Sequence, residues 1–133
     1  LDINQENNPT ICLGIGMGVG SQENVAKIIN IAQYLNAGVA TSRNVVHEGW
    51  LPYKFQVGIS GTTISPKIYL AIGLRGAFNH TVGIQKSGVI IGINTNKRHP
   101  IFKACDIGLV GDWEQILPVL IEKLKPLIAE YNN

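Results

Sequence analysis

Five short stretches of almost uninterrupted apolar residues constrain the fold of this 133-residue chain more than any other feature. The clearest read KIYLAI (67–72) and VIIGIN (89–94). Strands that are apolar on both faces are typical of parallel sheets that helices cover on both sides. The five strands that we expect are 10–15, 38–42, 67–72, 89–94 and 106–111.

Segments with helical patterns separate these strands. We expect helices from Ser21 to about residue 36, and over 44–48, 76–85 and 113–131. Ser21 is a good N-cap, and Glu23 in the first turn complements the helix dipole. Pro118 and Pro126 predict a kink or a division into two short helices, because an internal proline removes a hydrogen bond. The alternation predicts a three-layer, Rossmann-like α/β domain with a mainly parallel sheet flanked by helices.

The composition excludes several classes of protein. Hydrophobic residues make up 45% of the chain and charged residues 15%, against about 25% charged residues in an average domain. This balance is the opposite of that in disordered chains, and it indicates that part of the surface is covered by a partner. The net charge of +2 does not favour nucleic acid. No apolar run reaches the ~18 residues of a membrane-spanning helix, so we expect no membrane insertion.

No common catalytic, metal or dinucleotide motif is present. Cys12 and Cys105 lie in apolar surroundings and are expected to be small buried hydrophobes rather than a disulfide. The three histidines are far apart, which disfavours a zinc site. Glycine occupies every second position over 14–20, which departs from the Gly-x-Gly-x-x-Gly fingerprint, so a conventional NAD site is disfavoured.

Small and polar residues follow the predicted strands, and Asp106 is the polar residue of the fifth strand region. The segments after the first four strands are GIGMGVGS (14–21), TSR (41–43), GLRGAFNH (73–80) and NTNK (94–97). The carboxyl ends of parallel strands lie at one edge of a sheet, where such folds bind ligands. Small residues let backbone approach a ligand, helix amino termini offer N–H groups to phosphates, and arginines bind phosphate oxygens. Together these features predict a nucleotide-shaped site.

A longer set of residues resembles a known family. The pattern SRxxVxxGWxPxxxQVGxSG (42–61) continues as PKIYLAIGxxGAxxH (66–80), followed by Ile93-Asn94, Pro100-Ile101-Phe102 and Asp106. This series resembles the electron transfer flavoprotein alpha subunit, over about residues 14–124. The resemblance implies a DHS-like NAD/FAD-binding domain that binds one FAD in an extended pose. It also implies a heterodimer with a beta-type subunit, and electron relay from a flavin dehydrogenase to an acceptor.

The resemblance implies roles for individual residues. Ser42 and Arg43 would face the flavin and the diphosphate, Gln56 the ribityl or phosphate region, and Ser60, in place of the usual threonine, the redox nitrogen. His80 would lie at the pyrimidine edge as a positive or hydrogen-bonding group that raises the flavin potential. Asn94 and Asp106 would hold the adenosine end, and Asn79 replaces a glutamine beside the diphosphate. The full expected cofactor-binding set is Met17, Gly18, Ser42, Arg43, Gln56, Val57, Gly58, Ser60, Gly61, Arg75, Gly76, Ala77, Asn79, His80, Asn94 and Asp106.

Three positions depart from the family pattern. Met17 stands where most members have arginine, which removes a positive charge near the flavin and predicts a lower potential. Ile59 replaces a common glutamine and removes one hydrogen bond to the ring. Arg75 stands where a small serine usually lies by the diphosphate, and would either neutralise phosphate charge or crowd it.

The expected organisation is a lead-in or linker over 1–9 and an FAD-binding domain over 10–131, with the family's amino-terminal domain absent. We expect an electron carrier that turns over no substrate alone. Its expected location is the cytoplasm of a bacterium or archaeon, or the mitochondrial matrix of a eukaryote. Two alternatives of the same fold stay open: a module that binds AMP or an NAD-like nucleotide, and an interaction module without a cofactor.

Overall fold

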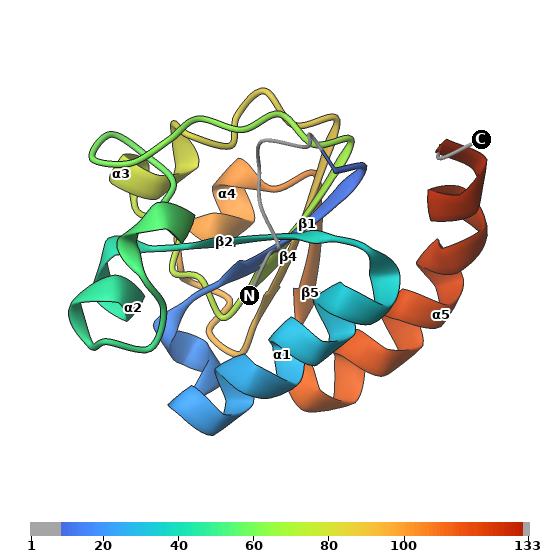
Figure 1. Cartoon of the computed structure of the whole chain (residues 1–133), viewed down its shortest axis with the longest axis horizontal. Coiled ribbons are helices and arrows are strands. Elements are labelled where there is room, and N and C mark those ends of the chain that lie inside the picture. Colours follow the sequence, from blue (N-terminus) through green and yellow to red (C-terminus); the bar gives the residue numbers. More distant parts are fainter. Residues whose placement is uncertain (1–8, 132–133) are drawn as a thin grey trace.

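A parallel sheet of five strands organises the computed structural model, which describes residues 9–131 (Figure 1). The expected lead-in therefore lies almost wholly outside the described residues. The strand order is β2-β1-β3-β4-β5, and every neighbouring pair is parallel. All five predicted strands are confirmed to within one residue at each end. They are β1 (Ile11–Ile15), β2 (Gly38–Thr41), β3 (Ile68–Ile72), β4 (Val89–Asn94) and β5 (Ile107–Val110).

Helices and loops cover the two faces of the sheet unequally. On one face, α1 (Gln22–Leu35) and α5 (Trp113–Tyr131) pack against alternate strand residues such as Leu70 in the larger core (Figure 1). Tyr69 points to the opposite face, because neighbouring strand residues alternate, and belongs to a smaller core. That face is covered by α3 (Phe78–Thr81), α4 (Ile101–Ala104) and the connecting loops. The predicted three-layer arrangement is confirmed.

The first helices follow the sequence pattern. Ser21 caps α1, and its side-chain oxygen accepts a hydrogen bond from the Asn24 backbone N–H at 3.2 Å. The helix ends at Asn36, which adopts the left-handed conformation. The next helix, α2 (Arg43–His47), lies one residue before the expected range. The start of α2 therefore places the polar residues Ser42 and Arg43 directly after β2.

The prediction of a helix over 76–85 is wrong in extent, because α3 includes only Phe78–Thr81. Gly76 has a positive φ of 90°, and a Cβ there would lie 2.2 Å from the Ile101 backbone nitrogen. This close contact with a segment distant in sequence prevents the helix from starting earlier. Turns occupy residues 82–86.

Of the two outcomes expected for the last helix, a kink or a division into two short helices, the division is wrong, because α5 runs without interruption over 19 residues and includes both prolines. Its buried side chains recur every three or four residues, so one continuous face packs against the sheet. This packing compensates for the backbone hydrogen bonds that proline removes. The buried residues are Trp113, Leu117, Ile121, Leu124 and Ile128.

The connection between β2 and β3 crosses the carboxyl edge of the sheet. It contains α2 and the short 3-10 helix η3 (Tyr53–Phe55), and the Val57 backbone N–H donates to the Thr41 carbonyl at 3.1 Å. The chain leaves β1 toward β2 on one side and returns to β3 on the other. The topological switch point, where such folds bind ligands, therefore lies between β1 and β3. Among the helices of residues 9–131, none has the length and apolar character needed to cross a membrane.

Candidate functional site

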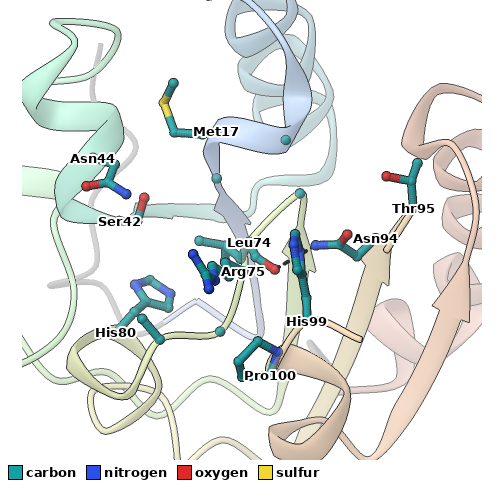
Figure 2. A pocket seen from close by; sticks show the side chains of 15 residues that line it. Met17, Ser42, Asn44, Leu74, Arg75, His80, Asn94, Thr95, His99 and Pro100 are labelled. Atoms are coloured by element: carbon teal, nitrogen blue, oxygen red, sulfur yellow. Dashed lines mark hydrogen bonds between the residues drawn. The ribbon is translucent and has the colours of Figure 1, made fainter. Parts of the chain in front are cut away.

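Two hollows lie along the carboxyl edge of the sheet. The larger, of about 570 Å³, is bordered by the loops after β1, β3 and β4 and by the start of α2 (Figure 2). The smaller, of about 250 Å³, lies between the start of α2, the loop around Val57 and α3. Ser42, Asn44, Ala77 and His80 line both. The hollows therefore adjoin and together offer an elongated site.

Most of the residues expected to bind a cofactor meet in these hollows. Eight line the larger one: Met17, Gly18, Ser42, Arg75, Gly76, Ala77, His80 and Asn94. The smaller hollow adds Arg43, Gln56, Val57, Ser60 and Asn79. Of the remaining three, Gly58 and Gly61 shape the loop that borders the smaller hollow. A Cβ at Gly58 would lie 1.9 Å from the Asn79 carbonyl oxygen, and one at Gly61 would lie 2.2 Å from the Gln56 carbonyl oxygen.

Asp106 lies at the opposite edge of the sheet. Its Oδ2 accepts a hydrogen bond from the Ile90 backbone N–H at 2.8 Å, and Ile90 is near the amino end of β4. The expectation that Asp106 lies with Asn94 is therefore wrong, because Asp106 precedes its strand whereas Asn94 ends one. The acidic residue that follows β5 is Asp112, whose Oδ1 accepts from the Glu114 N–H at 3.0 Å at the start of α5.

The alternating glycines after β1 serve packing within the protein. The Gly16 and Gly18 N–H groups donate to the carbonyls of Ile72 and Gly73, at 2.9 and 3.0 Å. A Cβ at Gly16 would lie 2.4 Å from the Gly73 carbonyl oxygen. The loops after β1 and β3 are thus interlocked at the switch point. Met17 projects from this loop at the border of the larger hollow and is 37% exposed (Figure 2).

Ser60 is fixed by two neighbours. The buried Gln56 side chain donates from Nε2 to the Ser60 Oγ at 3.0 Å, and the Tyr53 hydroxyl donates to the Ser60 carbonyl. A serine oxygen that already accepts a hydrogen bond can still donate its own proton. The Ser60 hydroxyl is therefore a donor oriented by Gln56 in the smaller hollow. Gln56 itself is largely enclosed, which favours a supporting role over a direct ligand contact.

His80 is a neutral ring in the wall between the hollows. Its Nδ1 lies 3.1 Å from the Val57 carbonyl oxygen, which can only accept, so Nδ1 carries the proton. Its Nε2 then accepts from the Tyr69 hydroxyl at 2.7 Å. Burial lowers the pKa of His80 to about 4 and raises that of Tyr69. At neutral pH the structure therefore places no positive charge at His80, and both ring nitrogens have partners inside the protein.

The two hollows are electropositive. Arg43 lines the smaller and Arg75 the larger, and neither forms a salt bridge with any residue that the structure describes. Within residues 9–131, no aspartate or glutamate lines either hollow. Phosphate oxygens are the natural partners of such unpaired guanidinium groups.

Seven residues that line the larger hollow are not in the expected cofactor-binding set: Gly16, Asn44, Gly73, Leu74, Thr95, His99 and Pro100. Each belongs to the residues that follow a strand, so a fuller use of the strand-end rule would have found them. The Nδ1 atom of His99 is buried and has no hydrogen-bond partner in the part of the chain that the structure describes.

The described residues contain no cluster of three or more His, Cys, Asp or Glu that could hold a metal ion. Both cysteines are free. Cys12 is buried as expected, and burial raises the pKa of its thiol well above its usual range. Cys105 is only partly buried.

The sequence of this chain is similar to the sequences of several known proteins. Residues 7–85 match a family model described as the electron transfer flavoprotein FAD-binding domain. Protein FixB of Clostridium saccharobutylicum is 41% identical over 128 residues, covering 96% of this chain and 38% of that protein. The electron transfer flavoprotein subunit alpha of Mycobacterium tuberculosis is 43% identical over 110 residues, covering 83% and 35%. The chain thus spans less than two-fifths of the length of these relatives.

Proposed function

Since this chain belongs to the electron transfer flavoprotein alpha family, as a form of its FAD-binding domain, we propose that it binds FAD along the two hollows and relays electrons through it. The matched family model is that of an FAD-binding domain, so FAD is the cofactor. The observation that carries the proposed site is the meeting of thirteen expected residues, from four separate loops, in one elongated depression.

The residues present fit FAD. A ligand with a diphosphate between two ring systems needs an elongated site with cationic donors and without carboxylates, and the adjoining hollows have this character. Ser42 stands at the N-cap of α2, yet its hydroxyl makes no cap hydrogen bond and stays available to a ligand. When bound, FAD supplies the capacity to accept and release electrons.

We assign the chain's own residues as follows. Arg43 would stabilise negative charge on the flavin side of the ligand, and Ser60 would donate its hydroxyl proton to a ring acceptor. Gln56 would act through Ser60, because its amide fixes the serine oxygen. His80 would act as a neutral wall residue that shapes the junction of the hollows.

The wider role is also a proposal. The family relationship supports a heterodimer with a beta-type subunit, with flavin dehydrogenases as electron donors and an acceptor downstream. The chain would carry electrons and turn over no substrate alone. The similar relatives named above are bacterial, which supports a bacterial cytoplasmic location.

Absorption spectroscopy tests the proposal. The chain, purified alone and together with a beta-type subunit, is expected to show a flavin absorption band after incubation with FAD. Arg43→Ala is expected to weaken FAD binding by about tenfold or more, since charge-assisted hydrogen bonds contribute about 1.5–3 kcal/mol. The exposed Lys86, in the turn before β4, provides a control, Lys86→Ala, of equal charge change. Absence of bound FAD in both preparations would refute the proposal.

A further inference from the structure

The larger hollow has a basic end of its own. Arg75 comes from the loop after β3, and His99 precedes α4 in the connection that follows β4. Figure 2 shows both side chains projecting into the hollow from their separate loops. Arg43, in contrast, lines only the smaller hollow. Each part of the elongated site therefore has a separate guanidinium group.

The loops that bear Arg75 and His99 are joined rigidly. The Ile101 backbone N–H donates to the Arg75 carbonyl at 2.8 Å, and Gly76 packs against Ile101 so closely that a Cβ would lie 2.2 Å from its nitrogen. Asn94 adds a second link, because its Nδ2 donates to the Leu74 carbonyl at 3.0 Å. The backbone segments that bear the two residues are thus held together, while the Arg75 side chain itself is exposed to solvent.

The His99 ring adds a second polar group to the basic end of the hollow. Its Nδ1 is buried and has no hydrogen-bond partner among the described residues. Nε2 is therefore the ring nitrogen that is left to contact a ligand. Arg75 adds up to five N–H donors, and no carboxylate of the described residues lines the hollow to compete for them.

We propose that Arg75 and His99 form a phosphate subsite that binds the diphosphate of an adenine nucleotide, whether or not a flavin is attached. For FAD this inference rests on the proposed function, but for ADP it stands alone. It also answers the question that the sequence left open, because it assigns Arg75 to neutralising phosphate charge rather than to crowding.

Calorimetric titration of the full chain tests the subsite with four ligands: ADP, adenosine, FAD and riboflavin. ADP is expected to bind more tightly than adenosine. Arg75→Ser is expected to weaken ADP and FAD binding by about tenfold, the effect of losing one charge-assisted contact, and to leave adenosine and riboflavin unchanged. Arg75→Lys should give an intermediate loss of ADP and FAD affinity, because it keeps the positive charge but loses the planar guanidinium group that can donate two hydrogen bonds to one phosphate. His99→Ala should weaken both phosphate-containing ligands severalfold. Lys86→Ser, a control of the same charge change at the opposite edge, should alter none of them.

The outcomes separate this inference from the proposed function. Tighter binding of FAD or ADP by Arg75→Ser would show crowding and overturn the subsite, as would equal affinity of the unaltered chain for ADP and adenosine. If FAD binds but Arg75→Ser and His99→Ala leave its affinity unchanged, the subsite fails and the proposed function stands. If FAD does not bind but ADP follows the expected pattern, the proposed function fails and the subsite stands.

Discussion

Burial of His80 makes the stability of this fold depend on pH. The pKa of His80 is about 4 in the folded chain, because burial disfavours the charged ring, against an ordinary value of 6.5 when the chain is unfolded. Between these values the unfolded chain binds a proton that the folded chain does not. Stability is therefore unaffected by this group above about pH 6.5 and decreases as the pH falls toward 4.

The size of the effect follows from the two pKa values. Each unit of difference corresponds to about 1.4 kcal/mol. Relative to neutral pH, linkage then lowers the free energy of unfolding by about 2 kcal/mol at pH 5 and by at most about 3 kcal/mol below pH 4. The groups in contact with the ring are the Tyr69 hydroxyl and the Val57 carbonyl, neither of which is ionised at these pH values.

Urea unfolding at pH 7.5 and pH 5 measures this loss. From pH 7.5 to pH 5, we expect the free energy of unfolding of the unaltered chain to fall by about 2 kcal/mol more than that of His80→Gln, which has no ring to protonate. His47→Gln changes an exposed histidine and should behave like the unaltered chain. Equal losses in the unaltered chain and His80→Gln would refute the reasoning. If His80→Gln does not fold, an NMR titration of the His80 ring decides, and a pKa near 6.5 would refute it equally.

Three further predictions concern the floor and the walls of the site. Gly14→Ala should destabilise the fold by about 3 kcal/mol in chemical denaturation, because its Cβ would lie 1.9 Å from the buried Tyr69 hydroxyl oxygen. A free energy of unfolding within about 1 kcal/mol of that of the unaltered chain would contradict this packing. Gln56→Leu and Ser60→Ala should each weaken FAD binding, and the double variant should lose little more FAD affinity than Ser60→Ala alone. Additive losses of affinity would show that Gln56 does not act through Ser60. Met17→Arg should raise the flavin potential in a redox titration, since it restores a positive charge beside the hollow; an unchanged potential would show that this position is too distant to matter.

The strands could be predicted from the sequence because their signal is local. A strand buried on both faces needs apolar side chains at every position, so Val89–Asn94 is evident without knowledge of its neighbours. The helix errors have the opposite cause. The late start of the helix after Gly76 depends on contact with Ile101, and the continuity of α5 despite Pro118 and Pro126 depends on packing against the sheet. Such contacts between distant segments leave no local pattern.

The site was predictable to the extent that it follows strand ends. Ser42, Arg75 and Asn94 directly follow strands or nearly so, and parallel strands bring their carboxyl ends together. Asp106 was misplaced because an aspartate beside a strand can lie at either edge, and only the strand's limits decide which. The neutrality of His80 could not be anticipated, since it results from burial and from the hydrogen bonds that its ring makes.

The interlocked glycines at the switch point have a consequence for how proteins of this kind can diverge. A Cβ at Gly73 would lie 2.7 Å from the Val19 backbone nitrogen. Any side chain at Gly16 or Gly73 would therefore force the ends of β1 and β3 apart. The base of the site therefore tolerates almost no change. Met17, 37% exposed, and Ile59, 63% exposed, are free of this constraint. We therefore expect variation at such border positions to alter the redox properties of a bound flavin while the backbone beneath it stays the same.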